Sequence, residues 1–158
     1  MQCEAVQAFA EELAAFQSID SAGINNLAKY AVEASEARQA DKIVEILEKQ
    51  AKVTRGGDVK RRHFQKNKMS IYCVIDSMLR HSKKVYKNRH GGEPYEMLLM
   101  NKVEPILKVI VETVEDGDKI RISKGLSKWQ QKEWFGNSNI SNTFFSFSLV
   151  NSSSNRIS

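Results

Sequence analysis

The stretch SIYCVIDSMLRHS, residues 70–82, decides the fold class of this chain. Its apolar residues recur every three or four positions, which is typical of one face of an α-helix. Asp76 lies among them, and Arg80 follows four residues later, so the two side chains are neighbours on the helix surface. This spacing alone predicts an i,i+4 ion pair at the rim of the apolar face, worth about 0.2–0.5 kcal/mol.

Helical spacing of apolar residues continues on both sides of this stretch, and no alternating strand pattern competes with it before residue 140. We therefore predict an all-α domain over residues 3–135. Pro105 should kink or split the helical pattern that starts at Pro94, because proline removes a helical hydrogen bond. The predicted helices are 4–17, a helix capped by Asp20 or Ser21, 39–53, 70–82, the pattern from 94 to 114, and 122–135. A turn is predicted at residues 115–118. Residues 136–158 form a Ser/Asn-rich tail that we expect to be mostly disordered.

The charges are distributed unevenly along the chain. Residues 1–49 carry 9 acidic and 4 basic side chains, whereas residues 50–92 carry 12 basic and only 2 acidic ones. A basic block of this kind attracts polyanions such as nucleic acid, phosphopeptides or acidic membrane. We predict a basic loop over residues 55–68, in which Lys60, Arg61 and Arg62 attract polyanions. The alternative is a solvent-exposed loop that binds no polyanion.

Residues that would support catalysis or metal binding do not occur in a recognisable pattern. The three histidines pair with no cysteine or carboxylate at metal-ligand spacing, and phosphate-loop, dinucleotide and nucleophile-elbow motifs are absent from the sequence. Two cysteines cannot build a disulfide framework, which favours a reducing compartment. No apolar run is long enough to cross a bilayer. We expect a monomeric binding module that is not an enzyme and uses no cofactor or metal.

Two separated motifs carry a resemblance to a known family. YCVIDSMLRHS (72–82) and DKIRISKGLSKWQQKEWF (118–135) resemble the CTD-interacting domain (CID/RPR) family, closest to the SR-related CTD-associated factors. The resemblance implies a right-handed superhelix of about seven helices, related to VHS and ENTH domains. It also implies binding to the phosphorylated C-terminal heptad repeats of the largest subunit of RNA polymerase II. A nuclear role in transcription termination or pre-mRNA 3′-end processing would follow.

The resemblance also implies roles for individual residues. Asp76 would hydrogen-bond the turn of the heptad peptide, Arg80 would lie beside the same groove, and Lys124 would contact a serine phosphate. Lys124 stands where many relatives have arginine, and Cys73 stands where the family has tyrosine. The expected peptide-binding set is Cys73, Asp76, Ser77, Arg80, Lys124 and Lys128.

Two other functions remain open from the residues. The first is a VHS- or ENTH-type trafficking adaptor that binds sorting peptides or acidic lipid, with the basic loop facing a membrane. The second is direct RNA binding through the basic loop, which would make RNA an additional partner.

Overall fold

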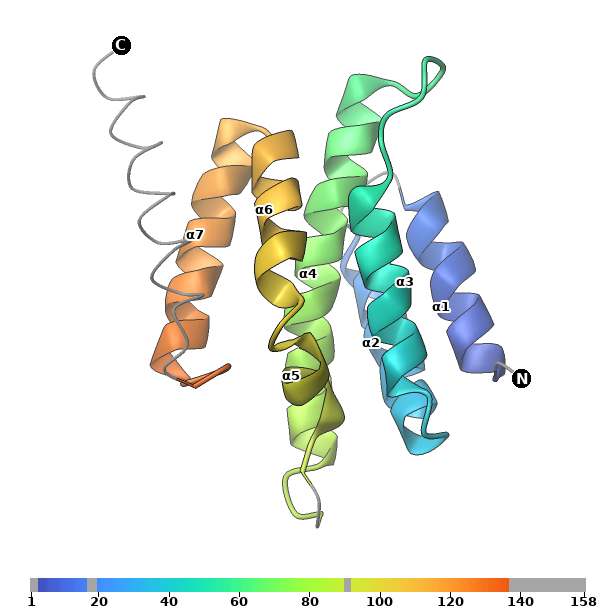
Figure 1. Cartoon of the computed structure of the whole chain (residues 1–158), viewed down its shortest axis with the longest axis vertical. Coiled ribbons are helices and arrows are strands. Elements are labelled where there is room, and N and C mark those ends of the chain that lie inside the picture. The colour runs from blue at the N-terminus through green and yellow to red at the C-terminus, as the bar shows by residue number, and fades with distance from the viewer. Residues whose placement is uncertain (1–2, 17–19, 90–91, 137–158) are drawn as a thin grey trace.

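The computed structural model describes residues 3–16, 20–89 and 92–136 of the chain, and these form seven α-helices with no strand (Figure 1). The predicted all-α fold class is confirmed. The helices are α1 (Glu4–Ala15), α2 (Ser21–Glu36), α3 (Ala40–Lys52), α4 (Arg61–Val85), α5 (Pro94–Leu99), α6 (Val103–Thr113) and α7 (Asp116–Gln131). Apart from Gly136, the predicted tail lies outside the described residues.

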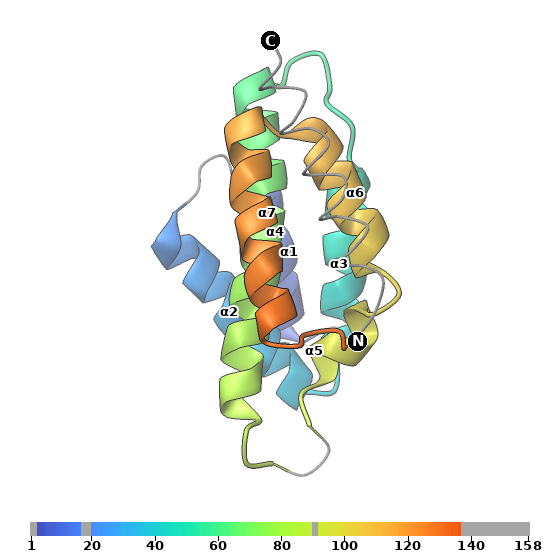
Figure 2. The same ribbon diagram turned by 90° about the vertical axis from the view of Figure 1, so that its left-hand side faces the viewer.

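Helix α4 is the longest helix and forms the centre of the structure (Figure 1). Its residues Ile71, Ile75, Met78 and Leu79 are fully buried, as their helical spacing predicts. Helices α1, α2 and α3 pack together on one side of the fold, and α6 packs against both α3 and α4. Turned by 90°, the structure shows α7 in front of α4 (Figure 2), and the hydrogen bond from Trp129 to Asp76 joins these two helices. Helix α2 also packs against α4.

Helix α4 begins at Arg61, well before the predicted start at residue 70. The predicted basic loop is correspondingly wrong over most of its length, because only residues 53–60 connect α3 to α4. The additional helical turns are held by buried polar side chains. The Lys68 ammonium, fully buried, donates to the carbonyls of Gln50 and Ala51 at the end of α3 at 2.6 and 2.8 Å. The last carbonyls of a helix lack the usual i+4 donor, so Lys68 adds donors at the end of α3, where the Gln50 carbonyl also accepts from the Val53 N–H at 3.3 Å.

Asn67 performs a similar task for α1. Its amide nitrogen donates to the carbonyls of Leu13 and Phe16 at 3.1 and 2.9 Å, and its oxygen accepts a hydrogen bond from Gln50 at 3.0 Å. One buried side chain thus joins α1, α3 and α4. A charged and polar sequence can form a helix here because these groups find partners in neighbouring elements.

The two prolines lie at the beginnings of helices. Pro94 is the first residue of α5, after Glu93, whose carboxylate accepts from the first backbone N–H groups. The pattern that starts at Pro94 is split as predicted, but at residues 100–102, and Pro105 lies in the first turn of α6. A first-turn N–H has no helical partner in any case, so proline is tolerated there.

The last helix also differs from its predicted bounds. Residues 115–118, predicted as a turn, supply the N-cap and first turn of α7, where acidic side chains favour the positive end of the helix dipole. The helix ends at Gln131 rather than Phe135, because Glu133 and Phe135 adopt positive φ angles of 60° and 64°. The Phe135 N–H then donates to Glu96 at 2.7 Å, which ties the chain back to α5.

Candidate peptide-binding site

Asp76 connects α4 to α7. Its Oδ2 accepts from Arg80 Nε at 3.0 Å, so the predicted i,i+4 pair is confirmed, and its Oδ1 accepts from Trp129 Nε1 at 2.8 Å. The Asp76 side chain is 27% exposed. A carboxylate has about four acceptor positions, so two hydrogen bonds leave capacity for a donor from outside. Asp76 is therefore held in one orientation and still open to solvent.

Two aromatic rings fill the space between α4 and α7. Tyr72 stacks on Trp129 with ring centroids 5.8 Å apart and an interplanar angle of 26°. The tyrosine hydroxyl lies against Gly125, at a distance where no Cβ would fit. Gly125 thus permits the close approach of the Tyr72 ring, and this packing positions the indole that bonds to Asp76.

An ionic contact also joins the two helices. Asp118, in the first turn of α7, is buried, and its carboxylate lies 3.6 Å from Lys66 on α4 and 3.5 Å from Arg121. We call the whole contact the α4–α7 seam. It consists of Lys66, Tyr72, Cys73, Asp76 and Arg80 from α4 and Asp118, Arg121, Gly125 and Trp129 from α7.

Two arginines from different helices, Arg80 and Arg121, lie close enough to Cys73 and Tyr72 to affect their pKa values. Burial raises the pKa of the Cys73 thiol to about 11, and the Arg121 guanidinium acts in the opposite direction. Burial also raises the pKa of Tyr72, with Arg80 and Arg121 both opposing the rise. The half-buried Cys73 thiol is therefore protonated at neutral pH. Its surroundings carry one guanidinium from each helix, and both guanidinium groups are more than half exposed.

The other predicted peptide-binding residues differ in how they are placed. Lys124 and Lys128 are exposed on α7. At 3.6 residues per turn, Arg121 is rotated about 40° from Gly125, whereas Lys124 is rotated about 100° away from it. Ser77 is fully buried, and its hydroxyl lies 3.3 Å from His81 Nδ1. The prediction that the Ser77 side chain contacts a peptide is therefore wrong, because that side chain has no exposed surface.

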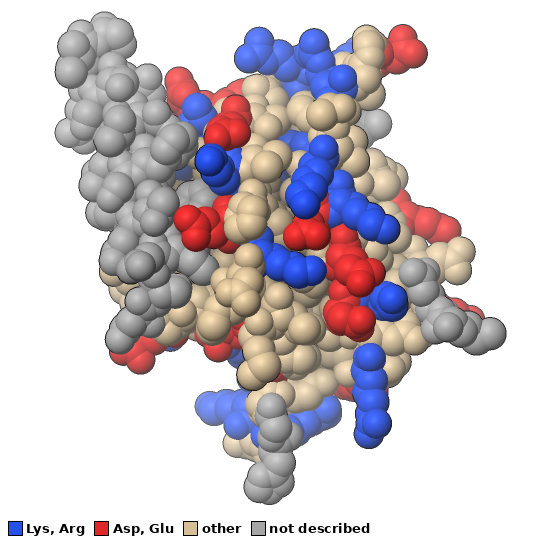
Figure 3. Space-filling model, in the orientation of Figure 1, with Lys and Arg blue, Asp and Glu red and all other residues tan. Residues whose placement is uncertain are grey.

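The three predicted polyanion-binding residues are exposed at the N-terminal end of α4. Lys60 is the N-cap residue, and Arg61 and Arg62 lie in the first turn. Figure 3 shows lysine and arginine side chains gathered at this end of the molecule. Asp76 follows Arg62 by 14 residues along one helix, a distance of about 21 Å. These basic residues are thus far from Asp76, although Lys66, at the near end of the seam, follows Arg62 by only one helical turn.

A comparison with protein-family models places the chain in a family. The model of the CID domain matches residues 7–143, which include every residue of the α4–α7 seam. The chain belongs to the CID family. No match was found among the curated proteins or among the solved structures. The family match supports the first of the expected functions, because CID domains as a family are protein-interaction modules for the C-terminal domain of RNA polymerase II.

The predicted peptide-binding set contains three of the nine seam residues, Cys73, Asp76 and Arg80, and lacks the other six. The bond from Trp129 to Asp76, the contact of Gly125 with Tyr72, and the position of Arg121 near Cys73 all join residues that are far apart in the sequence. A glycine inside an otherwise regular helical pattern was the available signal, because glycine in a helix interior is destabilising unless packing requires it. Among the described residues, no cluster of metal-ligating side chains occurs and no helix is long and apolar enough to span a membrane.

Proposed function

We propose that this CID domain binds the phosphorylated heptad repeats of RNA polymerase II at the α4–α7 seam and acts in the nucleus in transcription termination or pre-mRNA 3′-end processing. The observation that carries the proposal is the Asp76 carboxylate. It is oriented by Trp129 and Arg80, remains 27% exposed, and retains acceptor capacity. A peptide turn presents backbone N–H donors that match such an acceptor, and a hydrogen bond to a charged group contributes about 1.5–3 kcal/mol.

Basic side chains around Asp76 supply the contacts to phosphate. A phosphoserine carries about −1.5 to −2 charges at neutral pH and accepts charge-assisted hydrogen bonds. The resemblance assigns this role to Lys124, and the geometry adds Arg121, which is on nearly the same side of α7 as Gly125 and acts on the Cys73 thiol. Arg121 has the planar fork that can hold two phosphate oxygens at once, whereas Lys124 offers a single charged point.

The test is a fluorescence-anisotropy titration with two-repeat heptad peptides, phosphorylated at different serines or unphosphorylated, using a monomeric preparation of the full chain. Asp76→Asn keeps an amide oxygen for the Trp129 indole but removes the charge. It should weaken binding of every peptide by about 1–3 kcal/mol, with the far-UV helix signal intact. The matched control is Glu48→Gln on α3, because Glu48 forms an i,i+4 pair with Lys52 and is similarly exposed, at 29%.

The phosphate contacts are tested by Arg121→Ala and Lys124→Ala. Each should weaken binding of the phosphorylated peptides and leave the unphosphorylated peptide nearly unaffected, because the lost interaction is with phosphate. Unchanged affinity on Asp76→Asn, or a loss equal to that of Glu48→Gln, would overturn the anchor role of Asp76. Equal losses for both kinds of peptide in the basic variants would remove the phosphate assignment.

A further inference from the structure

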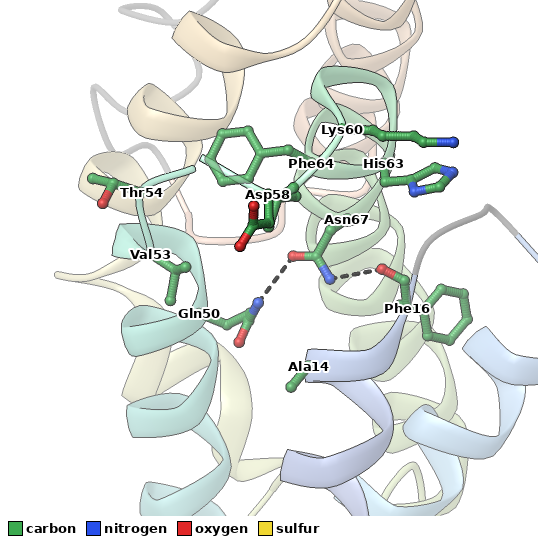
Figure 4. Close-up of a pocket in the computed structure, with 11 residues that line it drawn as sticks. Ala14, Phe16, Gln50, Val53, Thr54, Asp58, Lys60, His63, Phe64 and Asn67 are labelled. Carbon is green, nitrogen blue, oxygen red and sulfur yellow. Dashed lines mark hydrogen bonds between the residues drawn. The ribbon is translucent and has the colours of Figure 1, made fainter. Parts of the chain in front are cut away.

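A cavity of about 410 Å³ lies beside the N-terminal end of α4, at the opposite end of the helix from Arg80 (Figure 4). This volume is within the range of ligand pockets in proteins. Its walls come from the end of α1, the end of α3, the loop before α4 and the first turns of α4. The lining residues include Phe16, Gln50, Asp58, His63, Phe64 and Asn67.

The ring of Phe64 is the central feature of this region. It lines the cavity and also a second hollow of about 230 Å³, whose other walls include Arg55, Arg61 and Gln65. The buried Lys68 ammonium lies 5.0 Å from the ring centroid, so one face of the ring is turned toward the protein interior. The ring is half-buried, and it borders both hollows.

Polar groups near the ring can both donate and accept hydrogen bonds. Gln50 uses one of its two amide hydrogens in the bond to Asn67, and Asp58 brings a carboxylate to the cavity wall (Figure 4). An aromatic ring bordered by an amide and a carboxylate suits a planar heterocycle that carries N–H and C=O groups. A nucleobase has this chemistry, because it stacks on one face and hydrogen-bonds along its edge.

Lys60 lines the first hollow, Arg55 and Arg61 line the second, and Arg62 is the next residue on α4. All four are exposed, and we call them the basic rim. None of them forms an ion pair with another described residue, in contrast to Lys66, whose ammonium lies 3.6 Å from Asp118. Between residues 49 and 75, Asp58 is the only acidic residue in the sequence. The basic rim therefore keeps its charges free of ion pairs among the described residues, although the exposed Glu112 and Glu115 lie close to Thr113 in the wall of the second hollow, and free charges of this sign favour a polyanionic ligand.

We propose that this end of the molecule binds single-stranded nucleic acid, with phosphates along the basic rim and one base stacked on Phe64. The combination of charge and aromatic cavity favours a nucleic acid over a membrane, since anionic lipid needs only the charge. Phe64 precedes Asp76 by 12 residues on α4, about 18 Å. The proposed base-stacking position is thus well separated from the Asp76 anchor of the peptide site.

The experiment is a fluorescence-anisotropy titration of the full chain with a labelled single-stranded RNA and with DNA of the same sequence, from about 50 to about 300 mM NaCl. Arg61→Ser/Arg62→Ser should weaken binding and lower the slope of log Kd against log salt by about 1.4, because each lost phosphate contact contributes about 0.7. The matched control is Lys84→Ser/Lys87→Ser, which removes two exposed charges at the other end of α4 and should leave the slope unchanged.

Phe64→Leu tests the stacking separately from the charge. It should weaken binding about ten-fold or more without changing the salt slope, because stacking on an aromatic ring does not release counterions. Phe64→Trp keeps a stacking surface and should restore the affinity, which separates stacking from a loss of folding. RNA and DNA binding equally supports recognition of bases and phosphates, and tighter RNA binding adds a contact to the 2′-hydroxyl.

Three results would overturn the proposal. The first is no binding of either nucleic acid at about 50 mM salt. The second is an equal loss in the two charge variants, which would show attraction by net charge alone. The third is a combination of two findings: anionic vesicles displace the nucleic acid completely, and Phe64→Leu does not change its affinity. This would identify an acidic membrane as the ligand.

Discussion

A single methyl group at position 125 should separate α7 from α4. A Cβ on Gly125 would lie 1.6 Å from the Tyr72 hydroxyl oxygen and 2.8 Å from Tyr72 Cζ. The ring cannot move aside freely, because it is 6% exposed and stacks on Trp129. Gly125→Ala therefore forces either the ring or the helix to shift.

The expected change in stability is the difference of two effects. Replacing glycine by alanine within a helix normally stabilises it by about 0.8–1.0 kcal/mol. Overpacking a filled site costs about 1–3 kcal/mol, and occasionally more. Because the contact at 1.6 Å is far inside van der Waals distance, we take the upper part of that range. Gly125→Ala should then lower the free energy of unfolding by about 1–2 kcal/mol.

Urea denaturation followed by far-UV circular dichroism measures this change. Gly117→Ala is the matched control, because Gly117 lies in the same helix with open space around it, and it should not destabilise. In a Tyr72→Leu background the added methyl should be neutral or stabilising, so the two substitutions should show a coupling energy. If Gly125→Ala is as stable as Gly117→Ala, the close approach of Tyr72 to α7 is refuted.

Two further predictions concern the buried polar groups that hold the helix ends on α4. Burial lowers the pKa of Lys68 from its usual 10.5 to about 8. Between these two pH values the unfolded chain binds more protons than the folded chain. Lys68 therefore makes the free energy of unfolding rise with pH. The difference in unfolding free energy between the native chain and Lys68→Met should therefore increase from pH ~7 to ~9 in urea denaturation, and a constant difference would contradict the shift. Asn67→Ala removes the side-chain donor to the carbonyls of Leu13 and Phe16 and should lower the free energy of unfolding by about 1–3 kcal/mol. Asn67→Asp, which cannot donate from a carboxylate, should be at least as unstable in thermal melts; native-like stability of either variant would show that these bonds contribute little.

Helix positions could be predicted more reliably than helix ends. The apolar spacing around Ile71 and Ile75 identified α4 because it is repeated within one element. The start of α4 at Arg61 was missed because residues 61–68 are mostly polar, and their helical state depends on partners in α1 and α3. Buried polar groups of this kind have no signature in hydrophobic periodicity.

The candidate site shows the same division. The sequence by itself determined features that depend on residues close together in the chain. These are the Asp76–Arg80 pair, four residues apart, and the basic residues that follow the paired glycines Gly56 and Gly57. Helical geometry alone brings the first pair together.

Only the tertiary structure decided where the side chains of Asp76 and Ser77 lie and what they contact. The indole of Trp129 reaches Asp76 across 53 residues of sequence, while Ser77, the next residue along, is turned into the core. The cavity beside Phe64 is likewise formed by four segments of the chain. Such arrangements depend on how helices pack, and packing depends on the shapes of side chains that are distant in sequence, which the periodicity of a single helix does not encode.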